Sequence, residues 1–367
     1  MNGTLALPER PRILVITLRR LGDVLLTTPL LRTLRRGFPG ARIDVLVFAG
    51  TEGILKGNPD IDEIATVQLR ATLREHLALV RRIGRRYDLA VSTQTGDRPT
   101  LLAVLAARQR VGLVPQASGG HWWKAKAFHH AIPVNPNNHR VLELLGLAAC
   151  LGIDPHLQVV CPVEAAPEQP IRRGPYAVIH ANPMFRYRRW SDAGWHALAL
   201  GLVKRGMTIV ATGGSDPQER AYLDALWGSA LSPVERLDGR LDWPQLTALL
   251  RGAALYIGTD TSVTHLAAAA GCPTVALFGP TDPRLWGPWP ADGLNEAWSA
   301  AGSIQRRGNV WLVQHALPCT PCQKEGCERH LDSHAACLDE LSAGEVLAAA
   351  DQALADNAPV RSLAKRA

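Results

Sequence analysis

A short polar turn, residues 258–265 (GTDTSVTH), follows one apolar run and leads through a helical segment into a second such run. It places the hydroxyl groups of Thr261, Ser262 and Thr264 at the expected N-terminus of that helix. Phosphate oxygens are favoured at such a position, because backbone N–H groups and the helix dipole point toward them. Strand, turn, helix and strand make one βαβ unit. The segment therefore predicts a binding site for a nucleotide-linked ligand.

Two further loops follow apolar runs and carry groups that suit the same ligand. Residues 180–190 (HANPMFRYRRW) hold three arginines in four positions, and guanidinium groups bind a diphosphate through forked donors. Residues 212–219 (TGGSDPQE) offer glycines that allow close backbone approach, and Asp216 or Glu219 could hold ribose hydroxyls. A solvated basic loop would also explain the arginines. The prediction therefore depends on the loops taken together.

A candidate general base lies near the N-terminus, in residues 19–23 (RRLGD). These residues directly follow an apolar strand, at the end of the strand where open α/β sheets bind their ligands. Gly22 permits a tight turn, and Asp23 falls in the first turn of a helix, where the dipole stabilises a carboxylate. A carboxylate that faces a ligand can take a proton in a reaction. Capping the helix is the commoner role and remains the alternative.

Apolar strands alternate with amphipathic helices in two stretches of the chain, which is typical of doubly wound α/β domains. A polar, proline-containing stretch, residues 155–175, separates them and indicates a linker. We expect domains at residues 1–165 and 166–341, followed by a helical tail at 342–367. One helix is expected to run from Gly22 to Leu34, and residues 286–313, rich in Gly, Pro and Trp, are expected to form loops.

Composition narrows the class of protein without choosing a substrate. The chain has 367 residues, of which 47% are hydrophobic and 20% charged, so it should fold rather than stay disordered. Its net charge of +7 is compatible with nucleotide sugars, anionic lipid or nucleic acid. No apolar run approaches the ~20 residues that cross a bilayer. The N-terminal residues lack the apolar core of a signal peptide, so a cytoplasmic protein is expected.

Four of the seven cysteines cluster near the C-terminus and form a candidate metal site. In a cytosolic chain such a cluster indicates metal binding more than disulfides. Four thiolates suit tetrahedral zinc or iron, and a closed four-ligand site would be structural. Reduced, packed thiols are an equal alternative, and His330 or His334 could replace a ligand. The cluster consists of Cys319, Cys322, Cys327 and Cys337.

Five motifs occur in a characteristic order: residues 19–29 (RRLGDVLLTTP), 187–190 (YRRW), 212–214 (TGG), 258–265 (GTDTSVTH) and 277–283 (LFGPTDP). In this order they resemble the glycosyltransferase family 9 heptosyltransferases of lipopolysaccharide assembly. The resemblance spans roughly residues 12–350, and its first and fourth motifs together are specific. It implies a GT-B fold, with two Rossmann-like doubly wound domains facing a central cleft. The N-terminal domain would bind the acceptor and the C-terminal domain the donor.

The activity implied by this resemblance is inverting transfer of a heptose from ADP-heptose to a lipopolysaccharide core or related saccharide. Catalysis would need no cofactor, and any zinc or iron at the cysteines would be structural. Asp23 matches the family's proposed base. The expected donor-binding residues are Arg188, Gly213, Glu219, Asp260, Thr261, Ser262, Val263 and His265. Some members carry a hydroxyl pair where this chain has residues 182–184 (NPM), so contacts to the donor there must differ.

Residues of the N-terminal domain are expected to bind the acceptor. We expect Arg19, Arg20, Trp122 and Lys124 to contact a lipid-linked saccharide at the cytoplasmic face of the inner membrane, with peripheral membrane contact. A buried loop or an oligomer contact would use the residues around Trp122 equally well. A GT-B transferase or epimerase with another sugar nucleotide is the alternative. A zinc-ribbon nucleic-acid-binding protein is disfavoured, because the cysteines are not paired Cys-x-x-Cys motifs and aromatic residues make up 5% of the chain.

Overall fold

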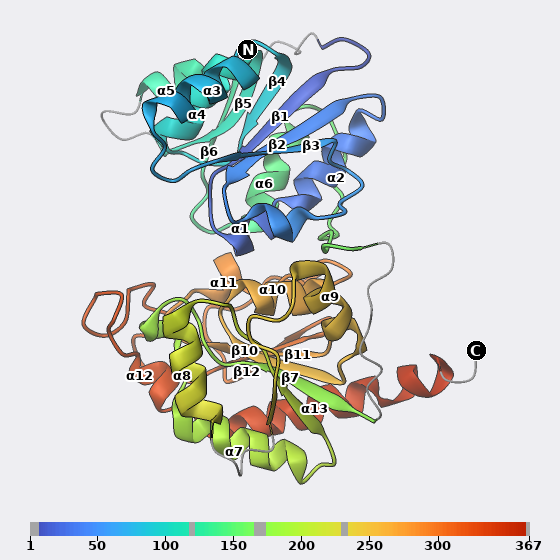
Figure 1. Cartoon of the computed structure of the whole chain (residues 1–367), viewed down its shortest axis with the longest axis vertical. Coiled ribbons are helices and arrows are strands. Elements are labelled where there is room, and N and C mark those ends of the chain that lie inside the picture. Colours follow the sequence, from blue (N-terminus) through green and yellow to red (C-terminus); the bar gives the residue numbers. More distant parts are fainter. Residues whose placement is uncertain (1–6, 117–121, 165–173, 229–233, 365–367) are drawn as a thin grey trace. The chain divides into compact units, whose positions relative to one another are not determined.

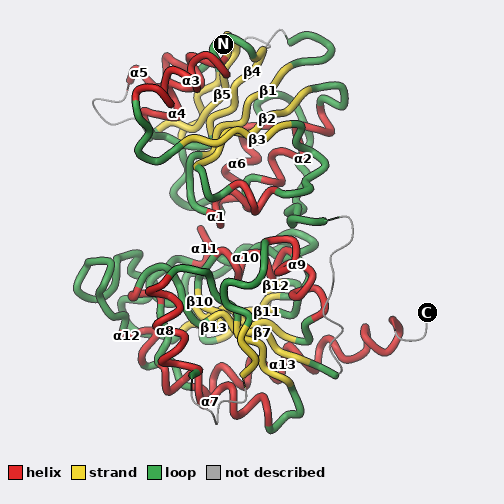
Figure 2. Tube along the Cα trace, in the orientation of Figure 1, coloured by secondary structure: helices red, strands yellow, loops and turns green. Residues whose placement is uncertain are grey.

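The structure, a computed structural model, describes residues 7–116, 122–164, 174–228 and 234–364 (Figure 1). The chain separates into two compact units, Met1–Pro162 and Val163–Ala367. Each unit holds one sheet with helices packed against it (Figure 2). Among the described residues, no helix is both long enough and apolar enough to cross a membrane.

The first unit contains a six-stranded parallel sheet in the order β3-β2-β1-β4-β5-β6. The chain moves outward from β1 to β3, returns to β4 beside β1, and then moves outward the other way. The loops after β1 and β4 therefore diverge at a switch point of the sheet. Its strands are β1 (Arg12–Thr17), β2 (Arg42–Phe48), β3 (Glu63–Val67), β4 (Tyr87–Ser92), β5 (Ala107–Val114) and β6 (His130–Pro133).

Helices cover both faces of this sheet (Figure 2). Apolar side chains of α3 and α4 pack on one face, with Leu79, Ile83 and Ala103 in its core. Helices α2 and α6 contact each other on the opposite face and bury Leu30 and Leu144 there. The helices are α1 (Leu21–Leu25), α2 (Thr28–Gly37), α3 (Leu73–Ile83), α4 (Asp97–Ala106), α5 (Trp122–Ala127) and α6 (Arg140–Ala149), with a 3₁₀ turn η1 (Glu52–Leu55).

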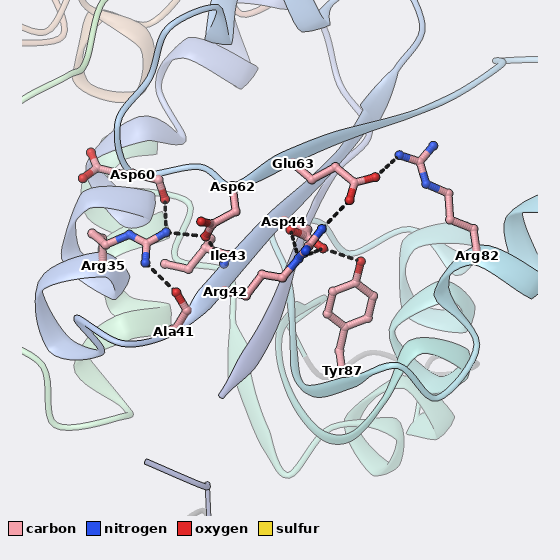
Figure 3. A network of polar contacts seen from close by, with 10 residues as sticks. All are labelled: Arg35, Ala41, Arg42, Ile43, Asp44, Asp60, Asp62, Glu63, Arg82 and Tyr87. Atoms are coloured by element: carbon pink, nitrogen blue, oxygen red, sulfur yellow. Dashed lines mark hydrogen bonds and ion pairs between the residues drawn. The ribbon is translucent and has the colours of Figure 1, made fainter. Parts of the chain in front are cut away.

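A network of ionic contacts joins the amino-terminal parts of β2, β3 and β4 (Figure 3). The Tyr87 hydroxyl donates to the buried Asp44 carboxylate at 2.9 Å, and burial together with this bond raises the pKa of Tyr87. Arg42 bonds both Asp44 and Glu63. The hydrogen bond from Arg82 lowers the pKa of Glu63. These groups stabilise one end of the sheet, opposite to the loops that follow β1 and β4.

The second unit contains a seven-stranded sheet in the order β12-β13-β11-β10-β7-β8-β9. All neighbouring strands are parallel except the antiparallel pair β12–β13. Strands β7 and β10 lie side by side, and the chain runs outward from each in opposite directions, which makes a second switch point. The strands are β7 (Tyr176–His180), β8 (Thr208–Ala211), β9 (Val234–Arg236), β10 (Leu255–Thr259), β11 (Thr274–Phe278), β12 (Ile304–Arg307) and β13 (Val310–Gln314).

Buried tryptophans and the long C-terminal helix fill the core of this unit. Trp190 and Trp195 meet edge to face at 4.9 Å, and the Trp190 indole donates to the Leu341 carbonyl at 2.7 Å. Helix α13 packs on α7, β11 and β13 and buries Val346 and Ala350. The helices are η2 (Arg186–Arg188), α7 (Asp192–Val203), α8 (Pro217–Trp227), α9 (Trp243–Gly252), α10 (Ser262–Ala269), α11 (Pro283–Trp286), α12 (Ala336–Asp339) and α13 (Ala343–Ala364).

Two local expectations from the sequence are wrong. The single helix expected from Gly22 to Leu34 is two helices, α1 and α2, because Pro29 lacks an N–H and favours the first turn of a new helix. Residues 286–313, expected to form loops, include the last residue of α11, the whole of strand β12 and most of β13. A turn at Gly308, with φ of 52°, joins these two strands into a hairpin.

Candidate functional site

One buried carboxylate, that of Asp260, joins three loops at the switch point of the second sheet. Asp260 follows β10, and Arg188 comes from the loop after the neighbouring β7. The Arg188 Nη1 lies 3.0 Å from the Asp260 Oδ2 and also donates to the Asp260 carbonyl at 3.3 Å. Thr281, in the loop after β11, donates its hydroxyl to the same Oδ2 at 2.7 Å. The carboxylate therefore sets the positions of loops that are far apart in the sequence.

His265 reaches this carboxylate from the first turns of α10. Its Nε2 lies 3.9 Å from the Asp260 Oδ1, and its side chain is buried. A cationic group, a hydroxyl and an imidazole thus surround Asp260. Arg188 remains partly exposed, with 29% of its side-chain surface accessible. Its guanidinium is therefore held in place on one side and can meet a ligand on the other.

The hydroxyl groups at the start of α10 divide into two roles. Thr261 caps the helix, since its hydroxyl accepts from the backbone N–H of Thr264 at 3.3 Å. Thr264 is fully buried and bonds the Thr259 carbonyl and the Tyr256 hydroxyl, so it supports the turn from within. Thr261 and Ser262 are partly exposed, whereas Val263 is buried. Of the three hydroxyl residues predicted to meet phosphate, only two are accessible.

The loop after β8 brings Glu219 back toward the glycines that begin it. The backbone N–H of Gly214 donates to the Glu219 Oε1 at 2.8 Å, and Asn182 also bonds this carboxylate. Burial raises the pKa of Glu219. A Cβ at Gly213 would lie 2.4 Å from a methyl group of Leu223, so the chain needs glycine there. Asp216, the other candidate, instead caps α8 through the N–H groups of Gln218 and Glu219 at 2.9 and 3.1 Å.

In the first unit, Asp23 is bound by two arginines and does not cap its helix. The N-cap of α1 is Arg20, without a side-chain capping bond. The Asp23 Oδ1 lies 2.8 Å from the Arg19 Nε and 3.7 Å from the Arg140 Nε. The capping alternative is therefore wrong for this residue. The two guanidinium groups fix the direction in which the carboxylate points.

Arg140 is a further residue of this site, and nothing near it in the sequence predicts its contact with Asp23. It begins α6 and is almost completely buried. Its Nη2 donates to the Thr93 carbonyl at 2.8 Å, and its Nη1 donates to Glu143 at 2.7 Å. Burial lowers the pKa of Arg140. This residue joins the loop after β4, the start of α6 and Asp23 into one arrangement.

A pocket of about 340 Å³ lies at the switch point of the first sheet. The Gln94 amide crosses between the two loops there, donating to the Leu18 carbonyl at 2.7 Å and accepting from the Leu18 N–H at 3.2 Å. Arg19, Phe48 and Arg98 also line the pocket. It is open enough to hold part of a small polar ligand next to the Asp23 partner Arg19.

The other residues predicted to contact an acceptor are placed differently from one another. Lys124 is buried, donates to the Thr95 carbonyl at 2.9 Å and pairs with Asp97 at 2.7 Å, so it positions a pocket loop from below the surface. Trp122 is 67% exposed, and Arg20 is exposed as well. Residues 117–121, directly before Trp122, lie outside the described residues.

The four C-terminal cysteines are neighbours in the fold. In the part of the chain that the structure describes, no group of three or more Cys, His, Asp or Glu residues is arranged to hold a metal ion. Burial, followed by the charges of Cys322, Cys327 and Cys319, raises the pKa of the Cys337 thiol to about 12. The backbone N–H of Ala336 donates to the Cys327 Sγ at 3.4 Å. The four thiols therefore lie close enough to influence one another's ionisation.

Comparisons with known proteins show the family of this chain. The model of the family "Glycosyltransferase family 9 (heptosyltransferase)" matches residues 76–327. Lipopolysaccharide heptosyltransferase 3 of Escherichia coli is 31% identical over 297 residues, which cover 76% of this chain and 86% of that protein. The solved structure of E. coli ADP-heptose lipopolysaccharide heptosyltransferase II has a TM-score of 0.70 at 18% identity, covering 94% of this chain and 99% of that one.

A third similar structure is that of TibC, an iron-containing dodecameric glycosyltransferase from enterotoxigenic E. coli. Its TM-score is 0.57 at 16% identity, covering 98% of this chain and 78% of that one. Two doubly wound units with polar loops at the carboxyl ends of their strands, together with these relatives, define a glycosyltransferase of the GT-B fold. The family model matches more than half of the chain. This protein belongs to glycosyltransferase family 9, as its motifs indicate.

The buried His180 at the end of β7 predicts a pH dependence of stability. Burial lowers its pKa from 6.5 to about 4, and its Nδ1 lies 3.1 Å from the Thr212 hydroxyl. Between these two pKa values the unfolded chain binds a proton that the folded chain does not. The free energy of unfolding should therefore fall by up to about 3 kcal/mol as the pH drops through this window.

The loss of stability on acidification can be measured by urea unfolding of the wild type and of His180→Asn at neutral pH and at about pH 5. The variant should lose less stability on acidification than the wild type, because it lacks the imidazole. Parallel losses in the two proteins would show that His180 does not carry the effect.

Proposed function

We propose that this enzyme transfers a heptose from ADP-heptose to a lipopolysaccharide core saccharide, with inversion at the anomeric carbon. The observation that carries the proposal is the shared Asp260 carboxylate, which holds Arg188 beside the N-terminus of α10. A guanidinium group and the N-terminus of a helix are both suited to binding a diphosphate. The relatives named above are heptosyltransferases, and one of them is described by its ADP-heptose donor.

In the proposed reaction, the second unit binds the donor. Arg188 and the N–H groups at the start of α10 stabilise the negative charge that develops on the leaving diphosphate, without a metal ion. Glu219 meets the ribose hydroxyls, with Gly213 allowing the backbone to approach. Asp260 and His265 keep Arg188 and the helix start in place. Thr261, Ser262 and Val263 complete the donor-binding turn.

The first unit binds the acceptor and supplies the base. Asp23 takes the proton of the acceptor hydroxyl as its oxygen bonds to the anomeric carbon, while the bond from that carbon to the diphosphate breaks. Arg19 and Arg140 orient the carboxylate. Arg20 and the pocket at the first switch point receive the acceptor sugar, and Trp122 contacts its lipid-linked surroundings. Lys124 acts indirectly, because it supports Thr95 in the pocket wall. Nucleic acid is not a partner in this proposal, and catalysis needs no cofactor.

Calorimetric titration without added divalent metal tests the donor. ADP and ADP-heptose should bind, whereas UDP and UDP-N-acetylglucosamine should not. Asp260→Ala should weaken ADP-heptose binding at least roughly tenfold, because Arg188 loses its partner. Thr281→Val, which removes one hydrogen bond to the same carboxylate, should have a smaller effect. Preferential binding of the uridine ligands would be consistent with the GT-B fold but would refute ADP-heptose as the donor. Unchanged affinity in Asp260→Ala would refute the site.

Replacement of Asp23 tests the base. Asp23→Asn keeps the shape of the side chain but removes its basicity, so turnover should fall roughly 10²- to 10⁴-fold while ADP-heptose affinity stays close to the wild type. Asp154→Asn, which changes an exposed carboxylate of the same unit, is the control and should keep full activity. Turnover of Asp23→Asn within a few-fold of the control would leave Asp23 only a structural role.

We also propose a structural zinc or iron ion at Cys319, Cys322, Cys327 and Cys337. Four neighbouring thiols are the donor set that both metals accept, and the N–H contact to Cys327 suits a thiolate. TibC, described as iron-containing, is a structural relative. Purified protein should contain roughly one equivalent of metal. Cys327→Ser should lose it, and Cys272→Ser, at a buried cysteine of the core, should retain it. Wild-type protein with well under one equivalent would refute the metal site.

A further inference from the structure

Helices α3, α4 and α5 of the first unit lie next to one another (Figure 1). All three present large apolar side chains to solvent. Helix α4 contacts both α3 and α5, so the three form one continuous surface. The exposed side chains belong to Leu73, Leu77, Val80, Leu101, Val104 and Trp122. Single exposed apolar residues are ordinary, whereas a contiguous group on adjacent helices marks an interaction site. We name this the α3–α5 face.

The spacing of residues on α3 shows that this exposure is regular. The helix buries Leu79 and Ile83 against the sheet. Leu73, Leu77 and Val80 follow the spacing i, i+4 and i+7, so they form a second stripe on another side of the helix. Leu73 is 77% exposed, more than any other large apolar side chain here except Met184. Helix α3 therefore has one apolar stripe packed against the sheet and a second apolar stripe that is available to a binding partner.

Arginines surround the apolar stripe. Residues 68–86 contain six arginines and one carboxylate, that of Glu75. Glu75 is engaged in the capping box with Thr72. Arg74 and Arg81 follow Leu73 and Val80 by one position, which places them about 100° around the helix from the stripe. Both are exposed. Long cationic side chains at this angle can reach anionic head groups while the leucines point into the acyl region.

We propose that the α3–α5 face docks on the surface of an anionic lipid bilayer. Apolar side chains flanked by arginine, with an exposed tryptophan, are the composition of helices that lie in a membrane interface. Each arginine near an anionic surface contributes to attraction, and the apolar stripe contributes by burial. A second copy of this chain is a poorer occupant, because the same face would bring two sets of arginines together.

The docking face continues into the pocket at the first switch point. Helix α4 begins at Asp97, and its first-turn residues Arg98 and Pro99 line the pocket. Lys124 of α5 donates to Thr95 in the pocket wall. Docking would therefore place the pocket close to the lipid head groups. The inference rests on the proposed function in one respect: a lipid-linked acceptor is presented at such a surface.

Co-sedimentation with vesicles tests the docking face. The full-length protein is mixed with vesicles of phosphatidylcholine alone, or of phosphatidylcholine with phosphatidylglycerol, and no acceptor is added. Wild-type protein should bind the anionic vesicles and bind the neutral ones at least roughly tenfold more weakly. Leu73→Gln/Leu77→Gln and Arg74→Glu/Arg81→Glu should each weaken binding to anionic vesicles at least roughly tenfold. These residues are exposed, so the variants should fold like the wild type.

Matched controls isolate the face. Leu200→Gln/Val203→Gln changes two exposed apolar residues of α7, and Arg36→Glu/Arg251→Glu makes the same charge change on α2 and α9. Both controls should bind vesicles like the wild type. Equal weakening in test and control variants, or no preference for anionic vesicles, would overturn the proposal. A change in oligomeric state of the α3 variants without vesicles would also overturn it and identify a self-association surface.

The vesicle measurement is separate from the test of transferase activity. Donor binding measured by calorimetry does not involve α3, so ADP-heptose affinity of the Leu73→Gln/Leu77→Gln variant should equal that of the wild type. Loss of vesicle binding with intact donor binding supports docking through this face. Absence of vesicle binding by an otherwise active wild-type enzyme would refute docking and leave the proposed function standing.

Discussion

The second unit depends on a single buried carboxylate at the place where its strand order reverses. Loops at the carboxyl ends of β7, β10 and β11 are brought to one edge of the sheet by parallel pairing, but pairing alone does not fix their conformations. Asp260 does so, because one of its oxygens accepts both the Arg188 guanidinium and the Thr281 hydroxyl. A buried anion is stable only when such partners surround it. The same requirement that stabilises Asp260 therefore holds a cation at the start of α10, where we propose that a diphosphate binds.

In the first unit the buried charged group is a cation and its functional partner is a carboxylate, the reverse of the second unit. There the buried group is the Arg140 guanidinium, which meets Glu143, the Thr93 carbonyl and Asp23. Asp23 lies between this buried cation and the more exposed Arg19, so its carboxylate has a defined direction. Each unit thus places one functional charge next to a buried opposite charge. The cysteine segment is joined to the loop after β11 by the backbone N–H of Gln323, which donates to the Pro280 carbonyl at 2.7 Å.

The fold and most of the candidate site residues could be predicted from the sequence. The features that could not be predicted have one physical cause in common. Alternating strands and helices indicate the doubly wound units, and the position of polar loops after strands indicates which residues meet. The family motifs indicate Asp23, Arg188 and Asp260. Contacts between distant segments could not be predicted, because Arg140 reaches Asp23 only through the packing of α6. The Thr264 hydroxyl points inward because it bonds the Tyr256 hydroxyl. The residues next to Thr264 in the sequence do not predict this contact.

The contact between Tyr256 and Gly258 limits how this site can vary. A Cβ at position 258 would lie 2.2 Å from the Tyr256 hydroxyl oxygen, which also bonds Thr264. Two residues on the same face of β10 and a third on α10 thus share one small volume. A side chain at position 258 can be accommodated only if the phenol at 256 shrinks, and Thr264 then loses a partner. The three positions should therefore change together during evolution, as a correlated triplet behind the turn rather than as independent sites.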